Sequence, residues 1–479
     1  MRQIIIILIF IFLSIFHSKA QEMLGMVNSN YAGINGTLIN PSSMVDSKLY
    51  LDISIVTANI FVQNNYIYLD KRNYYFPSFF SKNPNLKVQN NKVTLDYYNK
   101  RDKFLFANLR VNGPSAMVCI GRHAFGFYEG VRSAISINHV PYHIAKFIYD
   151  GLRYTPQQNI NYNMDKLRMA GLLWGEIAFS YAYIFYSENM NFFSGGITVK
   201  KEMGIMGIYL NDYGCKYNVP NDTTLVMNNL KAQYGSTNAH AFNGSGFAFD
   251  IGFTYEKKPS ESTMQFKKLC EQKYRDYIYK IGLSFLDIGA INFKNNATKY
   301  VINNGTTTFV NIQKISSKNS FDEDLLNGFG NQITKTNKFN LGMPKGVSVQ
   351  FDYKYRKYWY LNSTLVQGLN FGNAFVRRPS QISFTPRYER RWFEVNLPLS
   401  LYDYIYPRWG FSVRLFNLTI GTDKFGGLLS FNDFTGLDLY FSLKINFAKG
   451  SCGKGEGWKN FKTKIQKFYK CRKFKRTLL

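Results

Sequence analysis

The chain has 479 residues, a formal net charge of +28 and a mean hydropathy of −0.24. This hydropathy excludes a polytopic helical membrane protein, but it is compatible with a β-barrel, in which only every second strand residue faces lipid. Aromatic residues, mostly Tyr and Phe, make up 17% of the chain, and they favour strands and membrane interfaces. The composition therefore leaves one large barrel or several soluble domains.

The first twenty residues have the features of a secretory signal peptide. Arg2 supplies the positive charge, residues 4–16 form an apolar run, and Ser18-Lys19-Ala20 matches a cleavage pattern. We expect cleavage before Gln21, and an uncleaved anchor is the alternative. Export makes nucleic-acid binding a poor explanation of the positive charge. No later apolar run reaches the roughly 18 residues of a spanning helix.

Strand-like alternation of apolar and polar residues recurs along residues 21–448. It is clear at 49–55, 247–254, 279–285 and 347–352, and most regular from Leu437 to Phe447. This last segment has about the length that a tilted strand needs to cross a bilayer. Single-chain barrels have even strand numbers, so the sequence predicts an all-β fold: an antiparallel transmembrane β-barrel of about 14 strands that ends near Phe447.

Three polar, Asn-rich stretches, 82–101, 211–245 and 292–338, are predicted to be loops, with the long ones on the outside. Residues 141–153 form the best internal helix, because Ile144, Phe147, Ile148 and Leu152 fall on one face. This small helical element either plugs the lumen or lies in a loop.

Residues 449–479 form a basic tail, expected in the periplasm, with eleven Lys or Arg and one acid. Four apolar residues from Trp458 to Phe468 follow helical spacing. The tail therefore lies on the membrane face, docks on an acidic partner, or is a disordered basic segment. Cys452 and Cys471 lie close together in it, and a disulfide between them is plausible.

Several short motifs, in their order along the chain, resemble a known family. They are Gly36–Met44, Gly113-Pro114-Ser115, Gly121–Gly126, Trp174–Ile177, Gly244–Gly252, Leu283–Gly289, Pro386–Trp392, Ile420–Asp423 and Gly436–Phe441. Together they resemble a Bacteroidota outer-membrane family of unknown function, of the FadL-like and PorV-like barrel type, over about residues 25–447. The resemblance implies a place in the cell outer membrane and a fold, and implies an activity less strongly. The basic, Cys-containing tail departs from FadL-like barrels.

Six charged residues on polar strand faces are candidates to line the lumen. They are Asp52, Asp250, Asp352, Lys354, Asp438 and Lys444. Either they pair with one another and fill the interior, which is the simpler alternative, or they line a transport path. Asn40 and Pro41 set the turn before the first strand, and a role as an N-terminal plug or gate rests on the FadL resemblance.

The sequence predicts no enzyme, no metal site and no cofactor. His139 and His143 are four residues apart, but Pro141 between them interrupts a shared helix. Ser136 lies near His139 without a nucleophile-elbow motif, and Ser245 between two glycines is more simply part of a loop-to-strand junction.

Two functions remain. The first is FadL-like transport or holding of a hydrophobic or amphipathic compound by a barrel in contact with outer-membrane lipid. The second is a non-transporting scaffold or partner subunit of an envelope or secretion complex, for which the basic tail would provide the contact to a protein partner.

Overall fold

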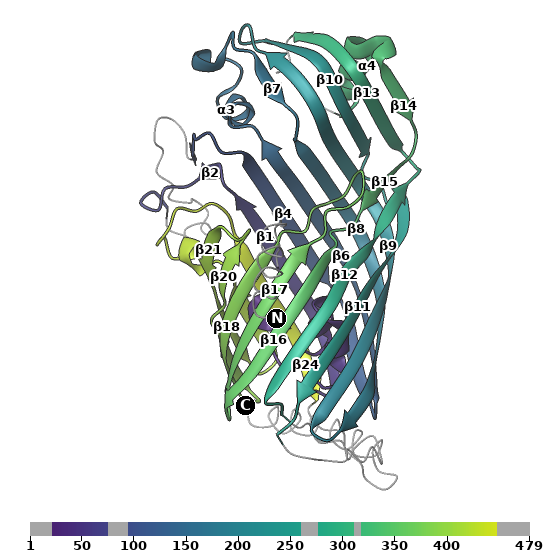
Figure 1. Cartoon of the computed structure of the whole chain (residues 1–479), viewed down its shortest axis with the longest axis vertical. Helices are drawn as coiled ribbons and strands as arrows, with labels where there is room; N and C mark the ends of the chain where they lie inside the picture. The colour runs from purple at the N-terminus through teal and green to yellow at the C-terminus, as the bar shows by residue number, and fades with distance from the viewer. Residues whose placement is uncertain (1–21, 75–93, 260–275, 311–317, 448–479) are drawn as a thin grey trace, which may run out of the picture.

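The computed structural model describes residues 22–74, 94–259, 276–310 and 318–447. Fourteen antiparallel strands close into a barrel, which confirms the predicted fold and strand number (Figure 1). Eleven of them are single continuous strands, and each of the other three is made of two short strands that follow one another along the chain. In chain order the barrel strands are β1 (Leu51–Asn64), β4 (Lys103–Asn112) with β5 (Ser115–Ile120), β6 (His123–Val140), β8 (Arg168–Glu188), β9 (Asn191–Asn218), β11 (Gly244–Lys257), β12 (Tyr279–Phe293), β16 (Gly346–Arg356), β17 (Trp359–Gly368), β18 (Gln381–Glu389), β19 (Phe393–Asn396) with β20 (Leu399–Tyr402), β21 (Tyr406–Trp409) with β22 (Phe411–Leu415), β23 (Leu418–Thr422) and β24 (Asp438–Phe447).

The barrel closes where its last strand meets its first. β24 pairs antiparallel with β1, from Leu51 opposite Phe447 to Phe61 opposite Asp438. One register shift, between Ser54 and Val56, interrupts this seam. The regular alternation seen in the sequence at 437–447 therefore belongs to the strand that completes the ring.

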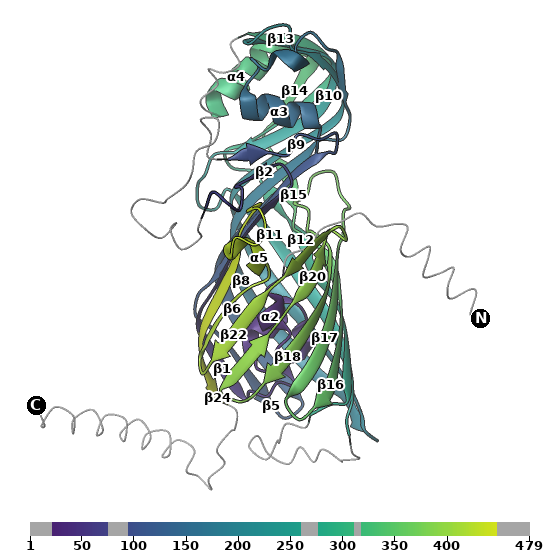
Figure 2. The ribbon, with the colours of Figure 1, turned by 90° about the vertical axis from the view of Figure 1, so that its left-hand side faces the viewer.

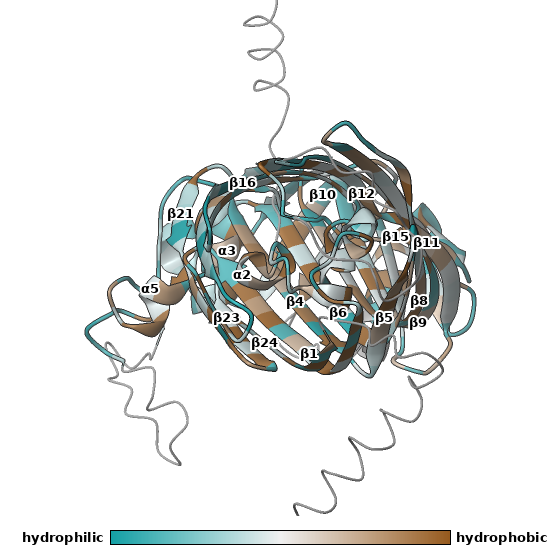
Figure 3. Ribbon diagram, turned by 90° about the horizontal axis from the view of Figure 1, so that it is seen from below, coloured by the Kyte–Doolittle hydropathy of each residue, from teal (hydrophilic) through white to brown (hydrophobic). Residues whose placement is uncertain are grey.

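The barrel wall is polar inside and apolar outside. In β11, Phe247 and Phe249 are 54% and 40% exposed, whereas Ala248 and Asp250 between them are buried. The same alternation runs along the other strands, as the bands of Figure 3 show. Apolar side chains that point away from the interior match the pattern of transmembrane barrels, where lipid replaces water on the outside. Among the described residues, no helix is both long and apolar enough to cross a membrane.

One end of the barrel has mostly short turns between strands, with the connection from β11 to β12 as the exception, and the other end carries a tall extension (Figures 1 and 2). The extension contains the upper half of β9 and four further strands, β7 (Tyr162–Met164), β10 (Thr224–Thr237), β13 (Ala297–Val310) and β14 (Ile333–Thr336). It also contains the helices α3 (Tyr142–Asp150), η4 (Thr155–Gln157), α4 (Lys318–Phe329) and η6 (Gly330–Gln332). It has a hydrophobic core of its own, in which Phe147, Tyr217, Tyr300 and Phe329 are buried.

Two of the three predicted loops contain long strands, and this corrects the sequence prediction. β9 continues to Asn218 and pairs there with β10, and β10 pairs with β13. These strands rise above the barrel, so they lack a lipid-facing apolar row, and the polar Asn-rich sequence hides them. Of the third predicted loop, residues 82–93 lie outside the described residues, and β3 (Leu95–Asp96) pairs with β2 (Ile67–Tyr68).

The predicted helix near 141–153 forms as α3, and it lies in the extension and not in the lumen (Figure 2). The lumen is occupied by the N-terminal segment, residues 22–49, which we call the plug. It contains α2 (Leu24–Val27), η1 (Gly33–Leu38) and η2 (Pro41–Met44), and none of its residues is fully exposed. β15 (Phe339–Gly342) pairs with β12 at the upper rim, and α5 (Phe425–Leu428) lies on the barrel's flank. The predicted signal peptide and basic tail lie outside the described residues.

Candidate functional site

The plug sits against glycines on the inner wall of the barrel. A Cβ atom added at Gly252 would lie 2.2 Å from Asn40 Oδ1, and one added at Gly196 would lie 2.7 Å from the carbonyl carbon of Pro41. At Gly282 an added Cβ would lie 2.8 Å from Asn40 Nδ2. Any larger residue at these positions would therefore displace the plug, because the interior is close-packed.

Asn40 and Pro41 lie in the plug at the start of η2. Asn40 Oδ1 accepts a hydrogen bond from the Ser42 backbone N–H at 3.0 Å and so caps η2, and Pro41 is its first residue. Asn40 Nδ2 donates to the carbonyl of Phe253 at 3.2 Å and to Gln350 Oε1 at 3.0 Å. One side chain thus connects the plug to two barrel strands.

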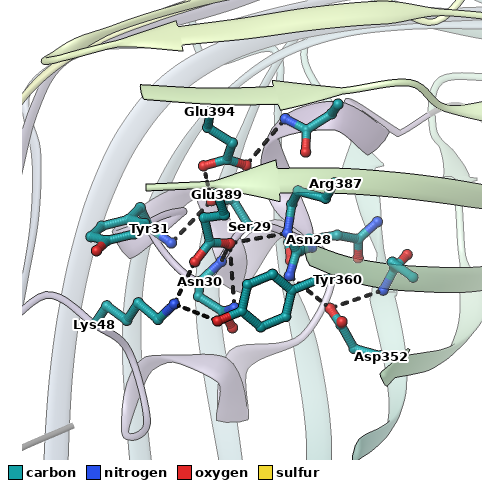
Figure 4. A network of polar contacts seen from close by, with 12 residues as sticks. Asn28, Ser29, Asn30, Tyr31, Lys48, Asp352, Tyr360, Arg387, Glu389 and Glu394 are labelled. Carbon is teal, nitrogen blue, oxygen red and sulfur yellow. Dashed lines mark hydrogen bonds and ion pairs between the residues drawn. The ribbon is translucent and has the colours of Figure 1, made fainter. Parts of the chain in front are cut away.

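A network of buried charges holds the plug near the short-turn end (Figure 4). Arg387 forms ion pairs at 3.0 Å with both Asp352 and Glu389, and its Nη1 donates to the Asn28 carbonyl of the plug at 2.6 Å. Lys48 of the plug lies 2.6 Å from Glu389. Burial lowers the pKa of Lys48, but Glu389, Tyr360 and Asp276 together outweigh burial and hold this pKa above its usual range.

A second network fixes the beginning of the plug. Glu22 accepts a hydrogen bond from Arg378 Nε at 2.9 Å. Arg378 lies 3.2 Å from Asp287, which also pairs with Arg132 at 3.1 Å and with Lys200 at 2.5 Å. All five side chains are at least nine-tenths buried. Removing one partner from such a network typically costs about 3–5 kcal/mol, because the other charge stays buried.

Five of the six candidate lumen residues, Asp52, Asp250, Asp352, Asp438 and Lys444, have buried side chains on inward strand positions. Asp52 lies 3.6 Å from Lys444 and accepts a hydrogen bond from the Ile34 N–H of the plug at 2.9 Å. Asp250 pairs with Lys200 at 2.7 Å. Lys354 differs, because it is partly exposed near the short-turn end and pairs with Asp276 at 2.7 Å. A role of these six in transport stays a prediction.

Sequence reasoning missed the most connected members of these networks. Arg387 and Glu389 alternate with Pro386 and Tyr388, and this alternation marks both charged residues as inward-facing. The signal was present, but an adjacent cluster of further charges in the turn that follows obscured it. Arg132 and Glu176 lie on inward positions of long strands in the same way.

The extension contains an apolar pocket of about 700 Å³ beneath α3. Asp150 and Arg153 are the charged residues of its lining, the other side chains are apolar or aromatic, and Ile148 is 77% exposed. Concave, mostly apolar cavities of this size are typical of small-molecule sites. The apolar and aromatic lining consists of Ile144, Phe147, Ile148, Tyr149, Leu152, Met164, Tyr217, Val219, Leu225 and Met227.

His143 packs α3 onto the wall of this pocket. Its Nδ1 hydrogen-bonds to the Tyr217 hydroxyl, and its ring stacks on Tyr162 at 4.2 Å between centroids. Burial lowers the pKa of His143 to about 4. The ring is therefore neutral at neutral pH and belongs to the apolar packing of the extension.

Acidification is expected to loosen α3. The pKa of an exposed histidine is near 6.5, so between that pH and about 4 the unpacked state of His143 binds a proton that the packed state does not. The packing of α3 is thus fully stable above about pH 6.5 and weakens as the pH falls. Hydrogen exchange of residues 142–150, corrected for intrinsic rates, should rise across this window, whereas His143→Gln should remove the dependence. Equal pH dependence in both proteins would exclude His143 as its source.

The alternative chemistries gain no support from the geometry. Ser136 is buried on the inner face of β6, and His139 is exposed on the opposite face, so the two cannot act together. His139 Nδ1 lies 3.4 Å from Asp102, whereas His143 contacts Tyr217. In the part of the chain that the structure describes, no three His, Cys, Asp or Glu side chains are grouped as a metal site requires.

A family model of a family of unknown function, DUF5723, matches residues 41–423, from the plug to the end of β23. The chain belongs to this family. The match confirms the predicted membership of a family without an established role, while the PorV-like relation and the Bacteroidota origin stay predictions. A comparison with curated proteins finds no significant match.

Solved barrels are similar in general architecture. A TodX mutant described as a monoaromatic hydrocarbon channel has 9% identity and a TM-score of 0.46, covering 90% of this chain and 100% of its own. The toluene transporter TbuX of Ralstonia pickettii has 9% identity and a TM-score of 0.42 over 90% and 99% of the two chains. A FadL homologue of Pseudomonas aeruginosa has 10% identity and a TM-score of 0.40 over 88% and 94%. Neither the identities nor the TM-scores are high enough to transfer a function to this protein.

Proposed function

We propose that this protein is a barrel of the outer membrane that takes up or holds a hydrophobic or amphipathic compound. The extension is the capture site, and the plug is the gate. The observation that carries the proposal is the apolar pocket of about 700 Å³ beneath α3, at the end of the barrel where the long connections lie. In outer-membrane barrels this end faces the outside and the short turns face the periplasm.

The plug determines what the lumen does in this state. Two cavities that plug residues line deep inside the barrel hold only about 50 and 40 Å³, which is little more than the space for a few water molecules. A larger cleft reaches the plug from the short-turn end, at Tyr31 and Lys48. Passage of a captured compound therefore requires the plug to move. The plug is held by ion pairs and hydrogen bonds to the wall and also by a buried apolar cluster, in which Met26, Ile34 and Met44 lie with the wall residues Met117 and Tyr128. Its movement must therefore break both kinds of contact.

The filled lumen also favours a second function, a scaffold or partner subunit of an envelope complex. A barrel that never opens needs no movable plug, and its buried charge networks then serve stability alone. Uptake by liposomes separates the two functions. A purified barrel that passes no hydrophobic solute, and that leaves the membrane bound to other proteins, would support the scaffold.

Placing a charge at the pocket's mouth tests the capture site. Ile148 is exposed and lines the pocket, so Ile148→Asp should fold normally. It should weaken binding of a fluorescent hydrophobic probe such as N-phenyl-1-naphthylamine by roughly tenfold or more, because the ligand must desolvate a carboxylate. Ile160→Asp, at a 44% exposed position of the extension outside the pocket, is the matched control. Unchanged probe binding by Ile148→Asp would remove the pocket from the proposal.

A further inference from the structure

A second cleft, of about 800 Å³, opens at the short-turn end of the barrel. It lies between the turn from β16 to β17 and the turn from β18 to β19, and it reaches the base of the plug at Tyr31 and Lys48. Five cationic side chains line it against two carboxylates. The cleft is thus strongly cationic, in contrast to the apolar pocket in the extension.

Both carboxylates of the cleft are already paired. Glu389 lies 2.6 Å from Lys48, and Asp276 lies 2.7 Å from Lys354. The other three cations, Lys357, Arg390 and Arg391, form no ion pair with any residue that the structure describes. They therefore present a positive charge that the acids among the described residues do not offset.

The turn that carries two of these cations is held from inside the barrel. Arg414 donates to the backbone carbonyls of Arg390 at 2.8 Å and Arg391 at 3.0 Å, and it pairs with Glu394 at 3.0 Å. The cations also lie over aromatic rings: Arg390 over Tyr358 at 4.7 Å, and Arg391 over the ring of the adjacent Trp at 4.6 Å. A site whose backbone and side chains are fixed in advance spends little free energy on ordering when it binds.

The surroundings of these cations are those of a membrane surface. Trp359 and Trp392 are each 49% exposed, and Phe393 is 38% exposed beside them. Trp residues concentrate at the level of lipid headgroups, and Arg is suited to bidentate contacts with phosphate oxygens. Outward-facing residues of the strands above the turns, such as Phe351 and Phe384, are apolar and exposed, as contact with acyl chains requires.

We propose that this cleft binds the phosphate headgroup of an anionic phospholipid in the membrane leaflet at the short-turn end. Lys357, Arg390 and Arg391 contact the phosphate, Trp392 lies at the level of the glycerol, and the acyl chains follow the outer face of β16 to β19. The inference rests on the membrane location in the proposed function, and is independent of whether the barrel transports any compound.

The test uses the full-length protein in lipid nanodiscs of phosphatidylcholine with a minor share of phosphatidylglycerol. Native mass spectrometry then counts the retained lipids of each class. The wild type should retain phosphatidylglycerol preferentially. The variant Lys357→Gln/Arg390→Gln/Arg391→Gln should lose this preference by about 100-fold, at roughly fivefold for each cation near a charged membrane surface.

A matched variant removes the same number of charges elsewhere. Lys216→Gln/Lys231→Gln/Lys294→Gln changes three exposed lysines of the extension and its base, and it should retain the preference. An equal loss in this control would show a general charge effect and overturn the proposal. Competition by millimolar inorganic phosphate at least as strong as by phosphatidylglycerol would also overturn it, because the cleft would then serve a soluble anion. Binding of the hydrophobic probe in the extension should be unaffected by the triple variant of the cleft. Failure of the proposed function and failure of this inference are therefore distinguishable.

Discussion

Deleting residues 22–44 should convert a closed barrel into an open pore. A barrel of about eight strands fills its interior with its own side chains, whereas barrels of about sixteen enclose an aqueous channel. With fourteen strands, this barrel needs the plug to fill the space between Gly252 and the opposite wall. In planar bilayers the wild type should show almost no current, and the deletion variant should show stepwise conductance at least about tenfold higher, as expected for a porin-like lumen.

A point substitution tests the same gate without removing the segment. Gly252→Val should push the plug aside, since even a Cβ there would lie 2.2 Å from Asn40 Oδ1. We expect intermittent openings from this variant. Gly175→Val is the control, because its added Cβ would meet the flexible end of Met203 at 3.3 Å and the Gly130 carbonyl at an ordinary contact distance of 3.9 Å.

Folding of the deletion variant and of Gly252→Val is checked separately by their heat-dependent shift in electrophoretic mobility. A deletion variant that folds and inserts but still passes no ions would show that something other than the plug closes the lumen. In that case the gate in the proposed function would have to be abandoned.

The barrel was predictable because its strands have lipid on one side and the lumen on the other, and this produces an alternation of apolar and polar residues with a period of two in the sequence. In β11, lipid on one side selects Phe247, Phe249 and Ile251, and the lumen selects Asp250 between them. The extension was not predictable in the same way. Its strands face water and a small local core, so neither side of β10 imposes a continuous apolar row, and polar Asn-rich sequence indicates a loop by default.

The plug was predictable only in part. Asn40-Pro41 marks a turn by local chemistry, but η1 and η2 are short 3₁₀ helices without an amphipathic period. Nothing in their sequence indicates that the surface burying them is a ring of strands hundreds of residues away, as in the contact of Asn40 with Gln350. The glycines opposite the plug give a signal only after the fold is known, because an isolated Gly in a strand has several explanations.

Arg387→Met should destabilise the barrel more than any surface substitution. Arg387 is 1% exposed and balances Asp352 and Glu389 while also holding the Asn28 carbonyl. Met fills much of the volume but leaves Asp352 buried without its cation. The free energy of unfolding, measured by urea titration of the protein in lipid vesicles, should fall by about 3–5 kcal/mol. Arg356→Met, on an exposed residue at the end of β16, should change it by less than about 0.5 kcal/mol.

The cause of this loss can be separated from poor packing by removing the stranded charge as well. In Arg387→Met/Asp352→Asn the carboxylate that has lost its only cation among the described residues is removed, and Glu389, the other partner of Arg387, keeps its 2.6 Å contact with Lys48. The double variant should therefore recover roughly half of the lost stability, a coupling of about 2 kcal/mol that neighbouring charges commonly show. If the two losses simply add, Arg387 acts through its bulk and its contact with Asn28. The charge balance inside the barrel would then contribute little to holding the plug.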